Sequence, residues 1–274
     1  MQKGLLNIPL LPVRSEPNER SEMTTQLLFG ESFDVLEVQG SWSKIRNHAD
    51  GYQGWATSKM LTELTDEMQA FLQRFPTVRT AQPLLCFKWV GAAKAGMYLP
   101  AGSRLHPSDD AASTFFVPTP TPSGYDLFEI KSSGLKTLNG EVSIEMNREN
   151  LYQLALQFLH APYLWGGKSI LGIDCSGLIQ LCCSILGFSM PRDASQQAKE
   201  GEALSLDDAR TGDLVFFAND LGRITHVGIV SKPGFVLHAS GNVRIDSLTQ
   251  EGIYNAELDL LTHKLHSVRR IFSN

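Results

Sequence analysis

The chain has 274 residues, of which 42% are hydrophobic, enough for one large domain or two to three small ones with buried cores. Its formal net charge of -5 argues against a nucleic-acid partner, because neutralising phosphates requires a basic surface. Four cysteines, two of them adjacent, do not make a disulfide framework, which favours a reducing compartment.

The N-terminal segment MQKGLLNIPLLPVRSEP does not have the pattern of a secretory signal. Asn7, Pro9 and Pro12 interrupt the apolar core that such a signal needs. No run of the chain approaches the roughly 18 apolar residues of a membrane helix. We therefore expect a soluble, cytoplasmic protein with no membrane partner.

Residues 10–61 have the pattern of a small β domain. Short alternating apolar runs are separated by turn signals at Gly30-Glu31, Gly40-Ser41 and Asp50-Gly51. The run VRSEP…TQLLFGE…VLEVQGSWSKIR…DGYQGWATSKML resembles a bacterial SH3 (SH3b) domain, and GYQGW is its most specific element. The resemblance predicts an SH3b domain over residues 1–64.

A connector and a second β region come next. The segment TDEMQAFLQRF favours a short helix, so residues 65–80 are expected to form a helical connector. Residues 81–142 return to β signals, with an apolar run, LLCFKWV, a Pro-rich turn, VPTPTPSG, and an alternating run, YDLFEI. Length and strand pattern favour a second, degenerate SH3b-like domain, although the GYQGW element is not repeated.

Residues 143–274 change to an α+β pattern. NRENLYQLALQFLH has apolar residues at helical spacing, and a second such set follows Cys175 and ends at Gly187. The later runs GDLVFFA, HVGIVSK and FVLHAS are typical of consecutive antiparallel strands. Helices followed by strands predict an α+β domain.

Cys175 lies at the start of the second predicted helix. A helix N-terminus carries partial positive charge and unpaired N–H groups, which we expect to lower the pKa of the thiol and to stabilise an oxyanion. Gly177 is expected to permit close approach of a substrate backbone. Cys182 and Cys183 lie about two turns further along and are expected to be buried packing residues.

A cysteine nucleophile needs a base and a group that orients the base. His226 and His238 would lie side by side if HVGIVSK and FVLHAS form a hairpin. Each histidine alone is more simply read as an ordinary strand residue. Their combination with Cys175 favours His226 as the base and His238 as the residue that fixes its tautomer.

Five motifs of this region, taken in chain order, resemble the NlpC/P60 family of papain-like cysteine peptidases. The motifs are YLWGG…GIDCSGLIQ, PRDASQQ, TGDLVFF, THVGIV and VLHAS. The resemblance implies an α+β papain-like NlpC/P60 catalytic domain, preceded by one or two small all-β SH3b barrels. It also implies a catalytic triad of Cys175, His226 and His238.

The resemblance assigns further residues around the nucleophile. Tyr163 matches a tyrosine whose hydroxyl contacts the thiol or the oxyanion, with a core aromatic as the alternative. Asp174 and Ser176 match residues that line the substrate site, although Asp174 would serve equally as a helix N-cap. Trp165 either walls the pocket or packs in the core, and Asp193 either binds a polar substrate group or caps a helix.

Other polar residues receive structural interpretations. Asp213 is expected to be a turn residue. No set of Cys and His has zinc spacing, so we predict no metal and no cofactor. The remaining histidines have no partner at useful spacing in the sequence, and these are His48, His106, His160, His263 and His266.

An SH3b domain beside an NlpC/P60 domain resembles the γ-D-glutamyl-L-diamino acid endopeptidases, which act on peptidoglycan stem peptides with a free N-terminal L-Ala. The resemblance implies that the SH3b domain walls one end of the cleft. An ammonium group there needs a carboxylate. The segment RSEPNERSEM offers Glu16, Glu19 and Glu22, of which we favour Glu22 together with Tyr52, with a solvated acidic loop as the alternative.

These observations predict a cysteine endopeptidase of cell-wall recycling whose partner is a peptidoglycan-derived peptide. It would hydrolyse the γ-D-glutamyl–diamino acid bond of L-Ala-γ-D-Glu-meso-diaminopimelate or its L-Lys counterpart and release L-Ala-D-Glu. The main alternative is a secreted hydrolase of intact peptidoglycan whose SH3b domains bind the wall. An inactive binding module and an acyltransferase of the same superfamily are less favoured.

Overall fold

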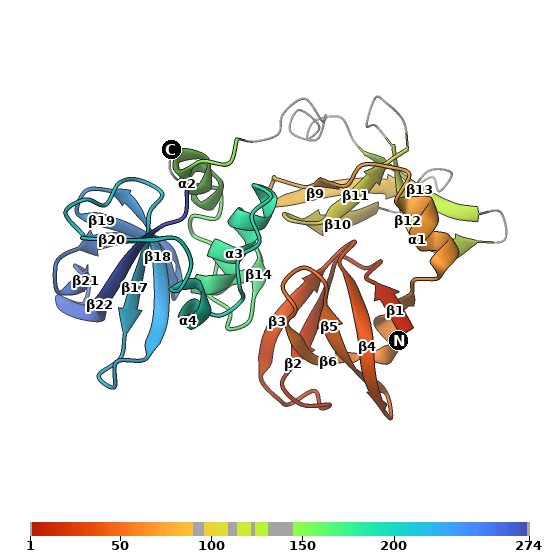
Figure 1. The fold of residues 1–274 in the computed structure, drawn as a ribbon, viewed down its shortest axis with the longest axis horizontal. Helices are drawn as coiled ribbons and strands as arrows, with labels where there is room; N and C mark the ends of the chain where they lie inside the picture. Colours follow the sequence, from red (N-terminus) through yellow and green to blue (C-terminus); the bar gives the residue numbers. More distant parts are fainter. Residues whose placement is uncertain (1, 90–95, 109–113, 122–123, 131–144, 273–274) are drawn as a thin grey trace. The chain divides into compact units, whose positions relative to one another are not determined.

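The computed structural model describes residues 2–89, 96–108, 114–121, 124–130 and 145–272. The chain divides into two compact units, residues 1–143 and 144–274 (Figure 1). The bounds of the predicted domains stay predictions, and the last part of the predicted second SH3b-like domain, 131–142, lies outside the described residues.

The first unit begins with an antiparallel seven-stranded sheet in the order β3-β2-β6-β5-β4-β1-β7. Gly30, Gly40 and Gly51 lie between consecutive strands at the predicted turns and have φ angles of 78°, 58° and 72°. Such left-handed backbone favours glycine. Alternate apolar residues fill the core of the sheet, among them Leu11 and Val13. The strands are β1 (Gln2–Leu5), β2 (Leu10–Arg14), β3 (Met23–Leu28), β4 (Ser32–Gln39), β5 (Trp42–Asn47), β6 (Gln53–Thr57) and β7 (Thr62–Glu63), with a 3₁₀ turn at Ser58–Met60.

A helix and a second antiparallel sheet complete the first unit. Helix α1 (Asp66–Leu72) begins where the Thr65 hydroxyl accepts a hydrogen bond from the Met68 N–H at 3.1 Å. It is shorter than the predicted connector, because β8 pairs with β11 and belongs to the second sheet. That sheet has the order β10-β9-β13-β12-β11-β8. Its strands are β8 (Val78–Arg79), β9 (Leu84–Trp89), β10 (Gly96–Pro100), β11 (Arg104–Pro107), β12 (Thr114–Thr121) and β13 (Gly124–Ile130).

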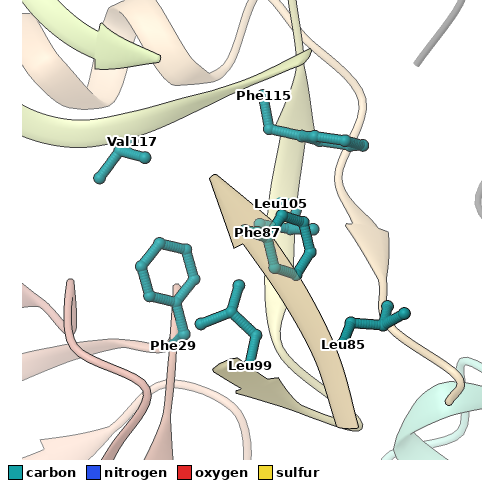
Figure 2. Close-up of a cluster of buried hydrophobic side chains, with 7 residues drawn as sticks. All are labelled: Phe29, Leu85, Phe87, Leu99, Leu105, Phe115 and Val117. Atoms are coloured by element: carbon teal, nitrogen blue, oxygen red, sulfur yellow. The ribbon is translucent and has the colours of Figure 1, made fainter. Parts of the chain in front are cut away.

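The two sheets of the first unit share apolar packing. Phe29, which follows β3, lies among buried side chains of the second sheet, including Phe87 and Leu99 (Figure 2). The Arg104 N–H donates to the Phe29 carbonyl at 2.8 Å, and a Cβ at Gly30 would come within 2.2 Å of the Arg104 carbonyl oxygen. Only glycine at position 30 allows this approach.

The described residues of the second unit, 145–272, form three helices, which are α2 (Arg148–Leu156), α3 (Cys175–Ile185) and α4 (Ala194–Gln197). The Asn147 side chain caps α2 by accepting from the Asn150 N–H at 2.8 Å. Both longer helices lie where the apolar spacing predicted them, and α3 ends before Gly187, whose φ is 85°. The first nine residues of α3 are buried, so this helix is a rigid support for whatever its N-terminus carries.

Strands of the second unit close into a barrel. Strand β22 pairs with β17 and also with β21, so the strands from β17 to β22 form a closed antiparallel ring with β16 at its side (Figure 1). The predicted α+β class is confirmed. The strands are β14 (Lys168–Ser169), β15 (Gly172–Ile173), β16 (Glu202–Leu204), β17 (Leu214–Ala218), β18 (Ile224–Lys232), β19 (Phe235–Ser240), β20 (Asn242–Leu248), β21 (Gly252–Asn255) and β22 (Leu260–Arg270).

Candidate active site

Cys175 is the first residue of α3, a helix that packs against β18 and β19. Its side chain is only 6% exposed. The sulfur accepts hydrogen bonds from the backbone N–H groups of Ser176 and Val227, and Val227 directly follows His226 on β18. The packing of helix on strand therefore brings the thiol beside the strand that carries His226.

Asp174 holds the start of α3 in place. Its carboxylate accepts from the N–H groups of Gly177 at 2.6 Å and Gly166 at 2.8 Å, and from the Arg192 guanidinium at 2.5 and 3.1 Å. Asp174 is thus the N-cap of α3, and its substrate contact stays a prediction. The expectation for Gly177 is wrong, because the space of its missing side chain faces the Gly167 carbonyl oxygen, 2.4 Å from an ideal Cβ.

The electrostatic surroundings of Cys175 differ from the prediction. Burial and, to a smaller extent, the neighbouring Asp174 carboxylate raise the pKa of the thiol to about 12. The N–H groups of Val227 and Ser176 and the Arg192 charge lower the pKa of Cys175 by less. The expected depression of this pKa is therefore wrong, because the helix N-terminus is outweighed by loss of hydration. The resting thiol is protonated at neutral pH.

Two histidines meet on adjacent strands, as the hairpin predicted. In the register of β18 and β19, Gly228 lies opposite His238, which places His226 on the same face and diagonally beside it. His226 Nε2 lies 2.9 Å from His238 Nδ1. His238 Nε2 in turn lies 3.0 Å from the carboxylate of Asp246 on β20. We call His226, His238 and Asp246 the histidine row. All three side chains of this row are buried.

Gly228 makes room for the histidine row. An ideal Cβ at this position would lie 2.5 Å from the Val236 side chain and 3.1 Å from the Cβ of His238. A larger residue would have to displace β19 or the His238 ring. Glycine at 228 therefore sets the spacing of the strands at the site.

His226 is neutral in the resting protein. Burial lowers its pKa well below the ordinary value, and the neighbouring His263 and His238 rings lower it further. Since Cys175 keeps its proton, the resting pair is a thiol and a neutral imidazole. Such a pair becomes reactive when the imidazole takes the thiol proton during attack.

A cavity of about 240 Å³ opens beside His226. Tyr163 lies in its wall, held by a hydrogen bond from its N–H to the Gly241 carbonyl at 2.9 Å. Burial raises the pKa of the Tyr163 hydroxyl, and the proximity of Cys175 and Asp174 adds to this. The residues that line the cavity are Tyr163, Thr225, His226, Ala239, Ser240, Gly241 and His263.

Comparison with known proteins decides the family. The model of the NlpC/P60 family matches residues 160–261, and that of the bacterial dipeptidyl-peptidase Sh3 domain matches residues 13–61. The γ-D-glutamyl-L-lysine dipeptidyl-peptidase of Bacillus subtilis is 31% identical over 91% of this chain and 81% of its own length. The chain belongs to the NlpC/P60 family. It is accordingly a cysteine peptidase.

Other proteins are similar to this NlpC/P60 peptidase over most of its length. Dipeptidyl-peptidase 6 of Lysinibacillus sphaericus is 28% identical over 89% of this chain and 91% of its own length. The crystal structure of an NlpC/P60 family protein from Bacillus cereus has a TM-score of 0.82 with 21% identity, and covers 98% of this chain and 99% of that one. The likeness of that structure shows that the fold is shared.

The PRDASQQ motif of this NlpC/P60 peptidase braces the first turn of α3. Arg192, only 2% exposed, donates to the Ser176 hydroxyl at 2.9 Å, and Gln197 donates to the Ser176 carbonyl at 2.9 Å. Asp193 occupies the N-cap position of α4, where its N–H donates to the Gln196 side chain at 3.4 Å. Sequence reasoning singled out Asp193 and missed the two bracing residues. Substrate contacts of Ser176 and Asp193 stay predictions.

His263 is a site residue that sequence reasoning missed. Its ring centroid lies 4.2 Å from that of His226, with an angle of 31° between the planes, and its Nδ1 lies 2.8 Å from the Thr262 hydroxyl. Burial lowers the pKa of His263 to about 4, and the His238 ring contributes. The expectation that His263 has no partner is wrong, because closure of the barrel through β22 brings a distant stretch of chain to His226.

Other predicted residues have these surroundings. Trp165 is 58% exposed, so its alternative as a core residue is wrong, and its role as a pocket wall stays a prediction. Cys182 and Cys183 are fully buried packing residues, as expected. Asp213 accepts from the Arg210 N–H at 2.9 Å and is buried in the turn before β17, which confirms its structural interpretation. His48 forms an ion pair with Asp34 at 2.9 Å in the first unit.

The SH3b residues lie in the first unit. Glu22 is exposed in the loop between β2 and β3, and Tyr52 is half-buried in the loop between β5 and β6. Glu19 pairs with Arg14 at 3.3 Å, and Glu16 is exposed. The contribution of these residues to substrate binding stays a prediction.

Membrane-crossing helices and metal clusters are both missing from the described residues. No described helix combines the length and apolar character needed to cross a membrane. In the same residues, no group of three or more His, Cys, Asp or Glu side chains is arranged to hold a metal ion.

Proposed function

We propose that this peptidase hydrolyses the γ-D-glutamyl–diamino acid bond of L-Ala-γ-D-Glu-diamino acid peptides and releases L-Ala-D-Glu. The observation that carries the proposal is the buried Cys175, His226 and His238 constellation beside a cavity. Its support is the likeness to relatives named γ-D-glutamyl-L-lysine dipeptidyl-peptidase, which extends over both the SH3 and the peptidase regions.

Acylation begins from the neutral pair. As the Cys175 sulfur attacks the γ-carbonyl carbon, its proton passes to the ring of His226. The negative charge on the carbonyl oxygen is stabilised by the Cys175 N–H, which has no intrahelical acceptor at the first helical position, and by the Tyr163 hydroxyl. His226 then gives its proton to the departing amine as the C–N bond breaks, leaving a thioester on Cys175.

Deacylation repeats the proton transfers with water. His226 takes a proton from the attacking water, the carbon–sulfur bond of the thioester breaks, and the proton returns to the Cys175 sulfur. The product is a dipeptide with a free γ-carboxylate. The enzyme is regenerated in its neutral form, consistent with a pKa of Cys175 near 12.

The free amine of L-Ala is the feature that distinguishes this substrate from intact wall. We assign its recognition to Glu22 and Tyr52, since a carboxylate and a phenolic oxygen are suitable acceptors for an ammonium group. Support comes from the match of residues 13–61 to an SH3 model that is named after dipeptidyl-peptidases.

A requirement for a free amine makes released peptides the natural substrate. We therefore propose a place in cell-wall recycling, in the cytoplasm. The four unpaired cysteines fit a reducing compartment. Fractionation of cells of the source organism tests the location, and recovery of the native protein only outside the cytoplasm contradicts it.

The substrate is tested with three materials, a free tripeptide, its N-acetylated counterpart and intact peptidoglycan. We expect rapid cleavage of the free tripeptide and little turnover of the other two. Equal cleavage of the free and acetylated tripeptides would remove the free-amine requirement. Preferential release of peptides from intact peptidoglycan would instead identify a wall hydrolase.

Glu22→Gln isolates the amine contact, with Glu16→Gln as the matched control in the same loop. Loss of a charge-assisted hydrogen bond costs about 1.5–3 kcal/mol, so kcat/KM for the free tripeptide should fall about 10- to 100-fold in the first variant only. Equal activity of the two variants would overturn the assignment of Glu22 without affecting the peptidase chemistry.

A further inference from the structure

The histidine row ends on a carboxylate that has its own partner. Asp246 accepts from Arg244, whose Nε lies 3.1 Å from Oδ1 and 2.9 Å from Oδ2, while His238 Nε2 lies 3.0 Å from Oδ2. Arg244 also bonds Glu257 at 3.1 Å. In the register of β19 and β20, Val236 lies opposite Asp246, so Asp246 repeats the diagonal step that relates His226 to His238.

The ionisation of Asp246 decides where the protons of the row lie. Burial raises the pKa of this carboxyl, but the hydrogen bonds from His238 and Arg244 outweigh it, and the pKa is lowered overall. An ionised carboxylate only accepts hydrogen bonds, so His238 must donate from Nε2.

A neutral imidazole carries one N–H, and the position of that proton is passed along the row. With the proton of His238 on Nε2, its Nδ1 is an acceptor and takes a hydrogen bond from Nε2–H of His226. The lone pair of His226 is then on Nδ1. This is the nitrogen left to take the proton of Cys175.

We propose that Asp246 is a positioning residue of the peptidase reaction, which together with Arg244 fixes the His238 tautomer and so makes His226 Nδ1 the base. The proposal concerns the proton path of the thiol attack, and it holds for any acyl substrate. It therefore does not rest on the specificity proposed above.

An asparagine at position 246 should be more harmful than an alanine. Arg244 has only donors to offer, so in Asp246→Asn the amide oxygen would turn to Arg244 and the amide NH₂ would face His238 Nε2. His238 would then carry its proton on Nδ1, and His226 would have to accept with Nε2 and keep its own proton on Nδ1. Alanine merely releases the His238 ring.

The test measures kcat and KM for a free tripeptide in Asp246→Asn, Asp246→Ala and Asp213→Asn. Asp213 is a matched control, because it is a buried carboxylate of the same barrel paired with Arg270 at 2.7 Å. We expect kcat to fall about 100-fold in Asp246→Asn and about 10-fold in Asp246→Ala, with KM nearly unchanged. Asp213→Asn should retain kcat. A larger loss with alanine than with asparagine points to packing alone and overturns the proposal.

A second variant and a spectroscopic readout complete the test. Removing Arg244 in the Arg244→Ala, Asp246→Asn double variant lets the amide turn, so kcat should recover several-fold relative to Asp246→Asn. ¹⁵N NMR of the histidine rings should show His226 protonated on Nε2 in the wild type and on Nδ1 in Asp246→Asn. The same His226 tautomer in both proteins, or no recovery in the double variant, contradicts the proposal.

Discussion

Two carboxylate–arginine pairs, each with a buried carboxylate, flank the reacting groups, and they perform different tasks. At the start of α3, Asp174 and Arg192 are 7% and 2% exposed as side chains, whereas on β20, Asp246 and Arg244 are 8% and 24% exposed. The first carboxylate uses its remaining acceptors on backbone N–H groups, and the second uses one on the His238 ring. The Asp174–Arg192 pair therefore stabilises the start of α3, and the Asp246–Arg244 pair determines which ring nitrogens of the histidines are protonated.

The difference shows why a carboxylate–arginine ion pair can either stabilise the fold or position protons at the site. A fully desolvated arginine depends on its carboxylate, because loss of the partner leaves an uncompensated buried charge. A partly solvated arginine does not. The exposure of the arginine, rather than that of the aspartate, separates the two pairs.

The largest expected effect is on stability. Asp174→Ala leaves Arg192 buried without its partner and removes the cap of α3. We expect the free energy of unfolding to fall by about 3–5 kcal/mol, measured by urea denaturation. A loss below about 1 kcal/mol would contradict the architectural role of this pair.

The reactivity of Cys175 should depend steeply on pH. Because its pKa is raised to about 12, the thiolate fraction grows about tenfold for each pH unit between 7 and 9. Iodoacetamide alkylation of Cys175, followed by mass spectrometry in a Cys86→Ser background, should speed up accordingly. A rate that is flat over this range would indicate a preformed thiolate and imidazolium pair.

A smaller loss of stability is expected at the second pair. Asp246→Ala leaves Arg244 in contact with water and with Glu257, so the free energy of unfolding should fall by about 1 kcal/mol. Urea denaturation beside Asp174→Ala gives the comparison directly. Equal losses in the two variants would remove the distinction between the pairs.

A further effect, which depends on pH, concerns His263. Its pKa is lowered to about 4 in the folded protein, below the ordinary value of 6.5, so the unfolded chain binds more protons between these limits. Stability from this group is present above pH 6.5 and is lost as the pH falls towards 4. His263→Phe keeps the stacked ring and should show a smaller drop in the urea midpoint between about pH 7 and pH 4.5. An unchanged drop would count against this origin of the pH dependence.

The sequence identified much of the site because local patterns carry it. Helical spacing after Cys175 and the two apolar runs with His226 and His238 predicted a helix start facing a hairpin, and the structure has both. Burial was not visible in these patterns, which is why the predicted direction of the Cys175 pKa was wrong.

The missed residues depend on contacts between distant elements. Arg192 reaches Asp174 across a loop, and His263 reaches His226 only because β22 closes the barrel. Asp246 had one local signal, its position on the strand after His238. Its position can be interpreted only once the register of β19 and β20 is known.

We propose that Cys175 carries the acyl group released from the γ-glutamyl bond. The direct measurement is mass spectrometry of the protein after rapid acid quench with L-Ala-γ-D-Glu-L-Lys, with peptide mapping of the adduct. We expect an L-Ala-D-Glu thioester on Cys175 and no adduct in Cys175→Ala, which should fold normally and turn over no substrate. Continued turnover by Cys175→Ala, or an adduct on another residue, would contradict it.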